Sequence, residues 1–218
     1  MEAETFPEGA TERGVYLAGP SGFTEPGALW HNTVLIPKVK AAGLIPIDPW
    51  ADQSELPELM ALPFGQERKD LLEQANLKLG RLDFARVEAA PAVLACLDGN
   101  DVDPGTALEV GYAHALGKLI VGFRTDLRLS ADNEGSLVNL MLHTACVDSG
   151  GILTTSVDDA VAHVAKVLGV EAPERNIPDN AVPNVCPHCL APTYSYKYAD
   201  GTTRYHEADG SLFCSEAS

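Results

Sequence analysis

Short apolar runs alternate with longer stretches of helical periodicity between residues 14 and 168. Continuously apolar runs bounded by turn residues are typical of strands that helices cover on both faces. We expect strands at residues 15–18, 44–47, 92–97, 119–123 and 152–154. The stretches between them carry apolar residues three and four positions apart, which predicts helices at residues 28–41, 66–89, 106–116, 136–144 and 157–168. A proline-rich loop is expected from the second strand to about Phe64.

Strands that alternate with helices along the chain form a parallel sheet with helices on both faces. The pattern therefore predicts an α/β protein with a flavodoxin-like, doubly wound, five-stranded parallel sheet. In such sheets the ligand binds beyond the carboxyl ends of the strands. Four polar clusters follow strands and are candidate site segments: residues 19–25, 48–53, 98–109 and 124–139.

The pattern changes at Glu171, after which prolines interrupt the chain and alternating aromatic residues follow. Asp200-Gly201 lies between two of these aromatic segments, a setting that indicates a β-hairpin. We therefore expect three parts. They are a flexible leader over residues 1–13, the main domain over 14–169, and an extension over 170–218 that forms a small β unit.

The chain is strongly acidic, since 31 Asp and Glu against 15 Lys and Arg give a formal net charge of −16. This charge repels phosphate backbones and anionic lipid, so we expect neither a nucleic-acid polymer nor a membrane as partner. The first residues are acidic where a signal peptide would be basic and then apolar. Cys96 and Cys146 lie in apolar surroundings that predict buried free thiols. We expect a cytoplasmic protein.

Residues 98–118 are the most informative segment, because they follow the third expected strand and open a helix. Thr106 and Glu109 fit a capping box, in which the glutamate bonds the first amide of the helix. With Asp98 and Asp101 as ordinary turn acids, this structural interpretation is the one that the pattern alone favours. Against it, three aspartates and a glutamate gather where a doubly wound sheet binds its ligand.

A carboxylate at Glu109 has a chemical use in that place, because it can attack an electrophilic carbon and form a covalent intermediate. At an anomeric carbon, the reaction also needs an acid that assists the leaving group. Asp83 and Asp103 are the candidates for that role and for hydrogen bonding to the ligand. For Asp83, which lies among apolar residues of a long helix, a solvated helix face is the alternative.

The sequence resembles the nucleoside 2'-deoxyribosyltransferase family over about residues 14–168. An ordered set of motifs carries the resemblance: Tyr16-Leu-Ala-Gly-Pro20 with Phe23, Asp83, Asp103-Pro-Gly-Thr-Ala-Leu-Glu109-Val-Gly-Tyr-Ala113 with Gly117-Lys118, and Asn139-Leu-Met141. It implies that residues 14–169 are the catalytic domain of a pentosyltransferase. Such an enzyme moves 2-deoxyribose between purine or pyrimidine bases by double displacement, with a deoxyribosyl-glutamate intermediate and retention at C1'.

The resemblance also implies a role for each matching residue. Glu109 would be the nucleophile that attacks C1', and Tyr16 would hold its carboxylate. Asp83 would contact the base and help to protonate it, and Asp103 would bind the deoxyribose hydroxyls. A neighbouring subunit would lend Asn139 to the 5' end of the sugar, so we expect a homo-oligomer with shared active sites. The partners would be a 2'-deoxynucleoside and a free nucleobase, and catalysis would need no cofactor.

Four further positions are expected to bind substrate: Gly19 and Phe23 in the first loop, and Asp48 and Trp50 after the second strand. Trp50 would stack on a base or, equally well, serve as a core aromatic. The histidines of the helical segments, His31 among them, are expected to have no chemical role.

Two other functions stay open. One is a 2'-deoxynucleoside 5'-monophosphate N-glycosidase, which shares the glutamate nucleophile but binds a phosphate in its first loop. No arginine or lysine lies between Arg13 and Lys38, which favours nucleosides over nucleotides. The other is a non-catalytic nucleoside-binding module.

The extension departs from the family's pattern. Val185-Cys-Pro-His-Cys189 resembles a zinc knuckle, and His206 and Cys214 would complete a Cys₃His site with Cys186 and Cys189. The alternative is a reduced, metal-free tail with three thiols.

Overall fold

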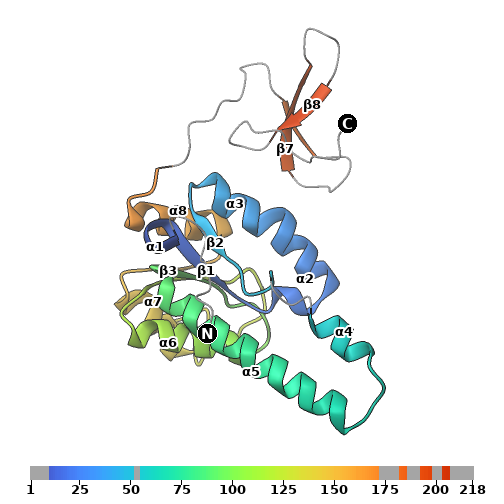
Figure 1. Ribbon diagram of the computed structural model, residues 1–218. Coiled ribbons are helices and arrows are strands. Elements are labelled where there is room, and N and C mark those ends of the chain that lie inside the picture. Colours follow the sequence, from blue (N-terminus) through green and yellow to red (C-terminus); the bar gives the residue numbers. More distant parts are fainter. Residues whose placement is uncertain (1–9, 52–54, 172–181, 186–191, 198–202, 207–218) are drawn as a thin grey trace.

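The computed structural model describes residues 10–51, 55–171, 182–185, 192–197 and 203–206. Its centre is a five-stranded parallel sheet in the order β2-β1-β3-β4-β5 (Figure 1). The strands are β1 (Gly14–Ala18), β2 (Ile45–Ile47), β3 (Ala92–Cys96), β4 (Leu119–Phe123) and β5 (Leu153–Thr154). The chain runs from β1 outward to β2 and then crosses to β3 on the other side of β1. The predicted doubly wound α/β sheet is confirmed, and its order reverses at β1 and β3.

Helices cover both faces of the sheet. α5 (Gln66–Ala89), α6 (Pro104–Ala115) and α7 (Leu140–Asp148) lie on one face, and α2 (Glu25–Trp30), α3 (Ile36–Ala41) and α8 (Val157–Leu168) lie on the other (Figure 1). Two short helices, α1 (Ala10–Arg13) and α4 (Glu55–Ala61), precede β1 and α5. In the described part of the chain, no helix is long and apolar enough to cross a bilayer.

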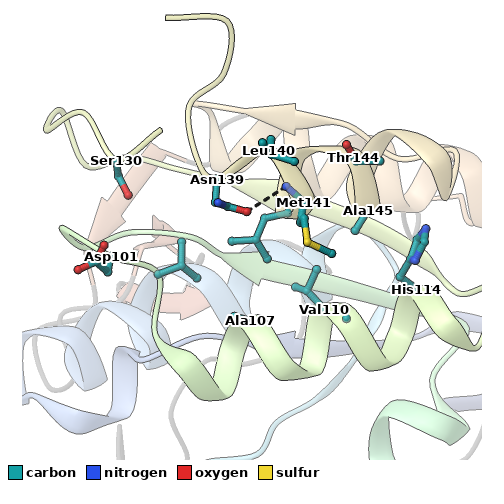
Figure 2. A pocket seen from close by; sticks show the side chains of 13 residues that line it. Asp101, Ala107, Val110, His114, Ser130, Asn139, Leu140, Met141, Thr144 and Ala145 are labelled. Carbon is teal, nitrogen blue, oxygen red and sulfur yellow. Dashed lines mark hydrogen bonds between the residues drawn. The ribbon is translucent and has the colours of Figure 1, made fainter. Parts of the chain in front are cut away.

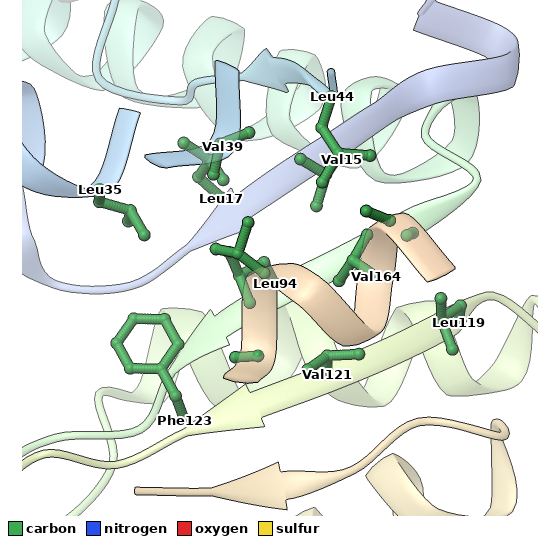
Figure 3. Packing of buried hydrophobic residues seen from close by; sticks show 14 of the residues in the cluster. Val15, Leu17, Leu35, Val39, Leu44, Leu94, Leu119, Val121, Phe123 and Val164 are labelled. Atoms are coloured by element: carbon green, nitrogen blue, oxygen red, sulfur yellow. The ribbon is translucent and has the colours of Figure 1, made fainter. Parts of the chain in front are cut away.

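The strand side chains divide between two cores, because successive residues of a strand point to opposite faces. Val15 and Leu17 of β1 pack in one core with Val39 of α3 and Val164 of α8 (Figure 3). Tyr16 points to the other face, where α5 and α6 lie. Burying one apolar side chain of this kind stabilises the fold by about 1.5–3 kcal/mol. The alternation therefore fixes which face of β1 carries the tyrosine.

The helix expected over residues 28–41 begins earlier and is not regular throughout. It starts at Glu25, because Thr24 caps it by accepting a hydrogen bond from a backbone amide. A π-helical turn over His31–Leu35 separates α2 from α3. Pro37 follows this turn within one continuous run of helix, and there its missing N–H and its ring disfavour a regular α-helical turn before it.

Two other sequence predictions about helices are wrong. The helix expected over residues 136–144 is α7, which begins later because the Asn139 side chain caps it by accepting from Met141 N at 3.0 Å. The expected proline-rich loop contains α4. An ion pair between Glu55 and Lys78 Nζ (2.9 Å) links α4 to α5, and acidic residues in its first turn favour its N-terminus.

A second, antiparallel sheet follows the main domain, with β6 (Val182–Val185), β7 (Pro192–Lys197) and β8 (Thr203–His206) in sequence order. Strands are thus present where the small β unit was expected. Asp200-Gly201, Cys186, Cys189 and Cys214 lie outside the described residues, so the zinc prediction stands as made. In the main domain, Cys96 and Cys146 are buried free thiols, as predicted.

Candidate active site

A hydrogen bond between a strand and a helix forms the centre of the candidate site. Tyr16, in the middle of β1, is fully buried, and its hydroxyl donates to Glu109 Oε1 at 2.5 Å. Glu109 lies on α6 and is half-buried. Both residues belong to regular elements, so their contact does not depend on a loop. One carboxylate oxygen is thereby oriented by Tyr16.

Burial and neighbouring charges determine the protonation of this pair. Burial, followed by the negative charge of Glu109, raises the pKa of Tyr16 far above its ordinary range, so Tyr16 remains a donor. Burial raises the pKa of Glu109 to about 7; the Tyr16 hydrogen bond opposes this shift, and the charges of Asp83 and Asp103 add to it. The structure therefore brings Tyr16, Asp83, Asp103 and Glu109 into one electrostatic environment, with Glu109 balanced between its two forms near neutral pH.

Asp83 has a cationic neighbour that the sequence analysis missed. Arg86, one helical turn further along α5, is only 7% exposed, and its Nη1 donates to Asp83 Oδ1 at 3.3 Å. Its positive charge also lowers the pKa of Tyr16, which places the guanidinium near the same site. The i,i+3 spacing from Asp83 was the available signal. The alternative interpretation of Asp83, that it lies on a solvated helix face, is therefore wrong, because it pairs with a buried arginine.

Asp103 lies at the N-terminus of α6, and the predicted capping box is wrong. The helix begins at Pro104, and Asp103 Oδ2 accepts from Thr106 N at 2.9 Å and from Thr106 Oγ1 at 3.2 Å. Proline favours the first helical position, which moves the cap back to Asp103. Thr106 is therefore inside the helix, and Glu109 bonds Tyr16 rather than a backbone amide.

The two aromatic candidates lie against one another. Phe23 and Trp50 form an edge-to-face pair with centroids 4.7 Å apart, and Phe23 is 71% exposed. Gly22 lies flat on the indole, since a Cβ there would be 2.1 Å from the ring. Trp50 Nε1 is buried, and no described residue accepts its hydrogen. Gly19 has a packing role, because a Cβ on it would lie 2.8 Å from Cys96 Cβ.

Asp48 is held by a histidine for which no chemical role was expected. The Nε2 atom of His31 lies 3.1 Å from Asp48 Oδ1, and Trp50 N donates to the same oxygen at 3.0 Å. His31 is buried at the start of the π-helical turn between α2 and α3. These contacts fix the segment after β2 and hence the position of Trp50.

Asn139 lies apart from these residues. It caps α7 and lines a groove of about 660 Å³ between α6 and α7 (Figure 2). Val110 and His114 of α6 point into this groove, whose lining includes neither Tyr16, Asp83 nor Glu109. Asn139 Nδ2 also donates to Asp132 at 3.3 Å. Within the described part of one chain, no hydrogen bond links Asn139 to Glu109, and the side chain of Asn139 bonds Asp132 and Met141 instead.

Comparisons with known proteins relate this chain to a protein family. The family model described as nucleoside 2-deoxyribosyltransferase matches residues 15–141. An uncharacterized protein of Schizosaccharomyces pombe, C191.05c, is 34% identical over 119 residues, which are 53% of this chain and 51% of that protein. This chain thus spans about half the length of the curated relative that it matches.

Among solved structures, a 2-deoxyribosyltransferase from Leishmania mexicana is 27% identical, with 70% of this chain and 96% of that chain covered and a TM-score of 0.49. A 2-deoxyribosyltransferase from Bacillus psychrosaccharolyticus is 22% identical, with 72% and 97% covered and a TM-score of 0.48. The CMP N-glycosidase BcmB from Clostridium botulinum is 17% identical, with 71% and 96% covered and a TM-score of 0.37.

Proposed function

The chain belongs to the nucleoside 2-deoxyribosyltransferase family, and we propose that it transfers 2-deoxyribose from a 2'-deoxynucleoside to a second, free nucleobase. The observation that carries this proposal is the Tyr16–Glu109 hydrogen bond of 2.5 Å, formed beside two further carboxylates. A half-buried carboxylate with one oriented oxygen is what a nucleophile needs at an anomeric carbon.

In the first step, the Glu109 carboxylate attacks C1', and the bond between C1' and the base nitrogen breaks. The electron pair of that bond leaves with the base, which takes up a proton. Tyr16 occupies Oε1, so the attack falls to Oε2. Asp83 is our candidate for delivering the proton from its protonated form, because it lies close enough to both Tyr16 and Glu109 to affect their pKa values. The product is an ester between Glu109 and C1'.

In the second step, a nitrogen of the acceptor base attacks C1', and the ester bond breaks. Glu109 regains its carboxylate, and the proton lost by the acceptor returns to Asp83. Each step inverts C1', so the new nucleoside keeps the original configuration. Asp103 would bind the deoxyribose hydroxyls at the start of α6. Neither step requires a cofactor, because the side chains supply both the nucleophile and the proton carrier.

The charge around the first loop supports nucleosides over nucleotides as substrates. Residues 14–37 contain no lysine or arginine, and Glu25 occupies the first turn of α2, the end of a helix that otherwise attracts phosphate. The Phe23–Trp50 pair supports a base-binding surface, since both rings offer apolar faces and Phe23 is exposed. Gly19 and Asp48 would complete this part of the site.

We further propose a homo-oligomer in which Asn139 serves a neighbour's active site. In support, Asn139 lines the α6–α7 groove, whose lining does not include Glu109. Leu140 and Met141 follow it on α7 and are exposed, with Met141 at 74%. Exposed apolar residues around a groove are typical of a surface that another chain covers.

An exchange assay tests the proposed reaction. A 2'-deoxynucleoside is incubated with a different free base, and the exchanged nucleoside is sought by chromatography. The expected result is exchange by the wild type and none by Glu109→Gln. Glu88→Gln is the matched control, because Glu88 also accepts from a tyrosine, Tyr112, but lies on the surface, and this variant should retain activity. Base release without exchange, or activity on monophosphates alone, would favour the N-glycosidase and contradict the proposal.

A further inference from the structure

A buried arginine connects two loops at the carboxyl edge of the sheet. Arg124 directly follows β4 and is 2% exposed. Its Nη1 donates to Leu97 O at 2.5 Å, and its Nη2 donates to Gly99 O and to Arg128 O, both at 2.8 Å. These acceptors lie on the loop between β3 and α6 and on the loop between β4 and α7. A buried cation is costly unless its donors are paired, and here both terminal nitrogens donate to backbone carbonyls.

The same two loops are also joined by the carboxylates of Asp98 and Asp126, each of which accepts hydrogen bonds from the other loop. The Asp98 carboxylate accepts from Thr125 N at 2.6 Å, from Thr125 Oγ1 at 2.7 Å and from Asp126 N at 2.8 Å. Gly99 N in turn donates to Asp126 Oδ2 at 3.2 Å. We call these contacts of Asp98, Gly99, Arg124, Thr125 and Asp126 the interloop network. Because it runs both ways, neither loop can shift without breaking hydrogen bonds to the other.

The loop held by this network leads directly into the candidate active site. Gly99 has φ +118°, and a Cβ there would lie 2.6 Å from Asp101 O, so the turn requires glycine. Asp103 ends the loop and caps α6, and Glu109 follows on the same helix. The place where the loop leaves the sheet therefore determines where Asp103 and the N-terminus of α6 lie.

We propose that Arg124 is a positioning residue for the reaction: through the interloop network it fixes Asp103 and the helix that carries Glu109. Its guanidinium is buried against backbone carbonyls, and it acts on the reaction only through the loop. Lysine is a poor substitute, because one ammonium on a flexible stem cannot reproduce a planar fork that reaches three carbonyls. This inference rests on the proposed function, which supplies the roles of Asp103 and Glu109.

The test separates positioning from general stability. Arg124→Lys is compared with Val164→Ala, which removes core volume on the opposite face of the sheet and lowers the melting temperature without touching either loop. The kinetics of base exchange give kcat and KM for the deoxynucleoside. Amide hydrogen exchange reports on the backbone of residues 98–103. We expect Arg124→Lys to lower kcat/KM at least tenfold and to speed amide exchange in that segment. In Val164→Ala, kcat/KM and the rate of amide hydrogen exchange in residues 98–103 should both stay within twofold of the wild-type values.

Kinetics and amide exchange that match the wild type in Arg124→Lys would overturn the inference. An equal loss of kcat/KM in Val164→Ala would do the same. Should Arg124→Lys not fold, Asp98→Ala provides the second variant, since it removes the carboxylate that accepts from Thr125 N, Thr125 Oγ1 and Asp126 N. If the wild type itself shows no exchange of bases, the proposed function fails. The amide-exchange comparison then still decides whether Arg124 fixes the loop.

Discussion

The Tyr16 hydroxyl lies 2.5 Å from Glu109 Oε1 and joins the centre of the sheet to α6. Strand β1 and helix α6 are packed in the same core, so the relative position of the two side chains is set by the fold itself. The hydrogen bond has two consequences for chemistry. It orients one carboxylate oxygen of Glu109. It also lowers the pKa of Glu109, which opposes the rise that burial causes.

Replacing Tyr16 with phenylalanine should impair the reaction without removing the nucleophile. The ring stays in the core, but the donor is lost, so the pKa of Glu109 should rise above about 7. We expect the wild-type rate to fall below about pH 7, where Glu109 becomes protonated, and the fall to begin at higher pH in Tyr16→Phe. The maximal rate should drop about 10- to 100-fold, the value of a hydrogen bond to a charged group.

Profiles of kcat against pH measure both effects. Tyr112→Phe is the control, since Tyr112 donates to Glu88 on the surface. A Tyr16→Phe profile that superimposes on the wild type would contradict the role given to this hydrogen bond.

Glu109 should lower the free energy of unfolding as the pH rises to neutrality, and the loss should persist at alkaline pH. The folded protein keeps the proton on Glu109 up to about pH 7, whereas the same carboxyl group in an unfolded chain loses it at about pH 4.3. The folded state therefore binds more protons between these values, and the free energy of unfolding falls as pH rises across this window. Glu109→Gln removes this dependence and should be more stable than the wild type at pH 8 by about 1–3 kcal/mol.

Urea unfolding at pH 5 and pH 8 measures this difference. At pH 5 the wild type and Glu109→Gln should differ little, because both side chains are neutral. An equal difference at the two pH values would show that Glu109 is not the titrating group.

The position of Asn139 predicts complementation between two inactive variants. Glu109→Ala and Asn139→Ala should each lose most exchange activity. When the two proteins are unfolded together and refolded as a mixture, mixed oligomers contain some sites that have both Glu109 and Asn139. With random mixing, about a quarter of the sites have both residues, so the mixture should recover about a quarter of the wild-type activity. A mixture as inactive as its components would refute shared sites, and Leu77→Ala, an exposed position on α5, serves as the control variant.

Metal analysis tests the zinc expected in the extension. Protein purified under reducing conditions should contain one zinc per chain, and Cys186→Ser with Cys189→Ser should abolish it. Base exchange should survive this loss, since the proposed reaction uses no metal. Absence of zinc together with reactive thiols in the untreated protein would favour the metal-free tail.

Most of the sheet was predictable because its strands are continuously apolar. The runs that became β1, β3 and β4 are long enough to identify, and the periodicity of α5 and α8 gave their bounds directly. The helix starts were missed where a side chain decides them, as Asn139 does for α7 and Asp103 for α6. Capping depends on backbone geometry that residue types alone do not reveal.

The candidate site was predictable only in part. Asp83, Asp103 and Glu109 were candidates from their carboxylate chemistry and Tyr16 entered through the resemblance to a family, and the structure brings the four into one environment. The interactions of Arg124 were invisible, because its acceptors are backbone carbonyls, and no pattern of residue types marks those. The pairing of His31 with Asp48 was missed for another reason, since it depends on a π-helical turn.

Trapping the proposed intermediate tests the central claim most directly. A 2'-fluoro-2'-deoxynucleoside slows breakdown of a glycosyl ester, so incubation followed by mass spectrometry of the digested protein should locate the added sugar on Glu109. The adduct should disappear when a free base is added, and it should be absent in Glu109→Gln. A wild type that exchanges bases without any adduct on Glu109, or with the sugar on another residue, would contradict the account.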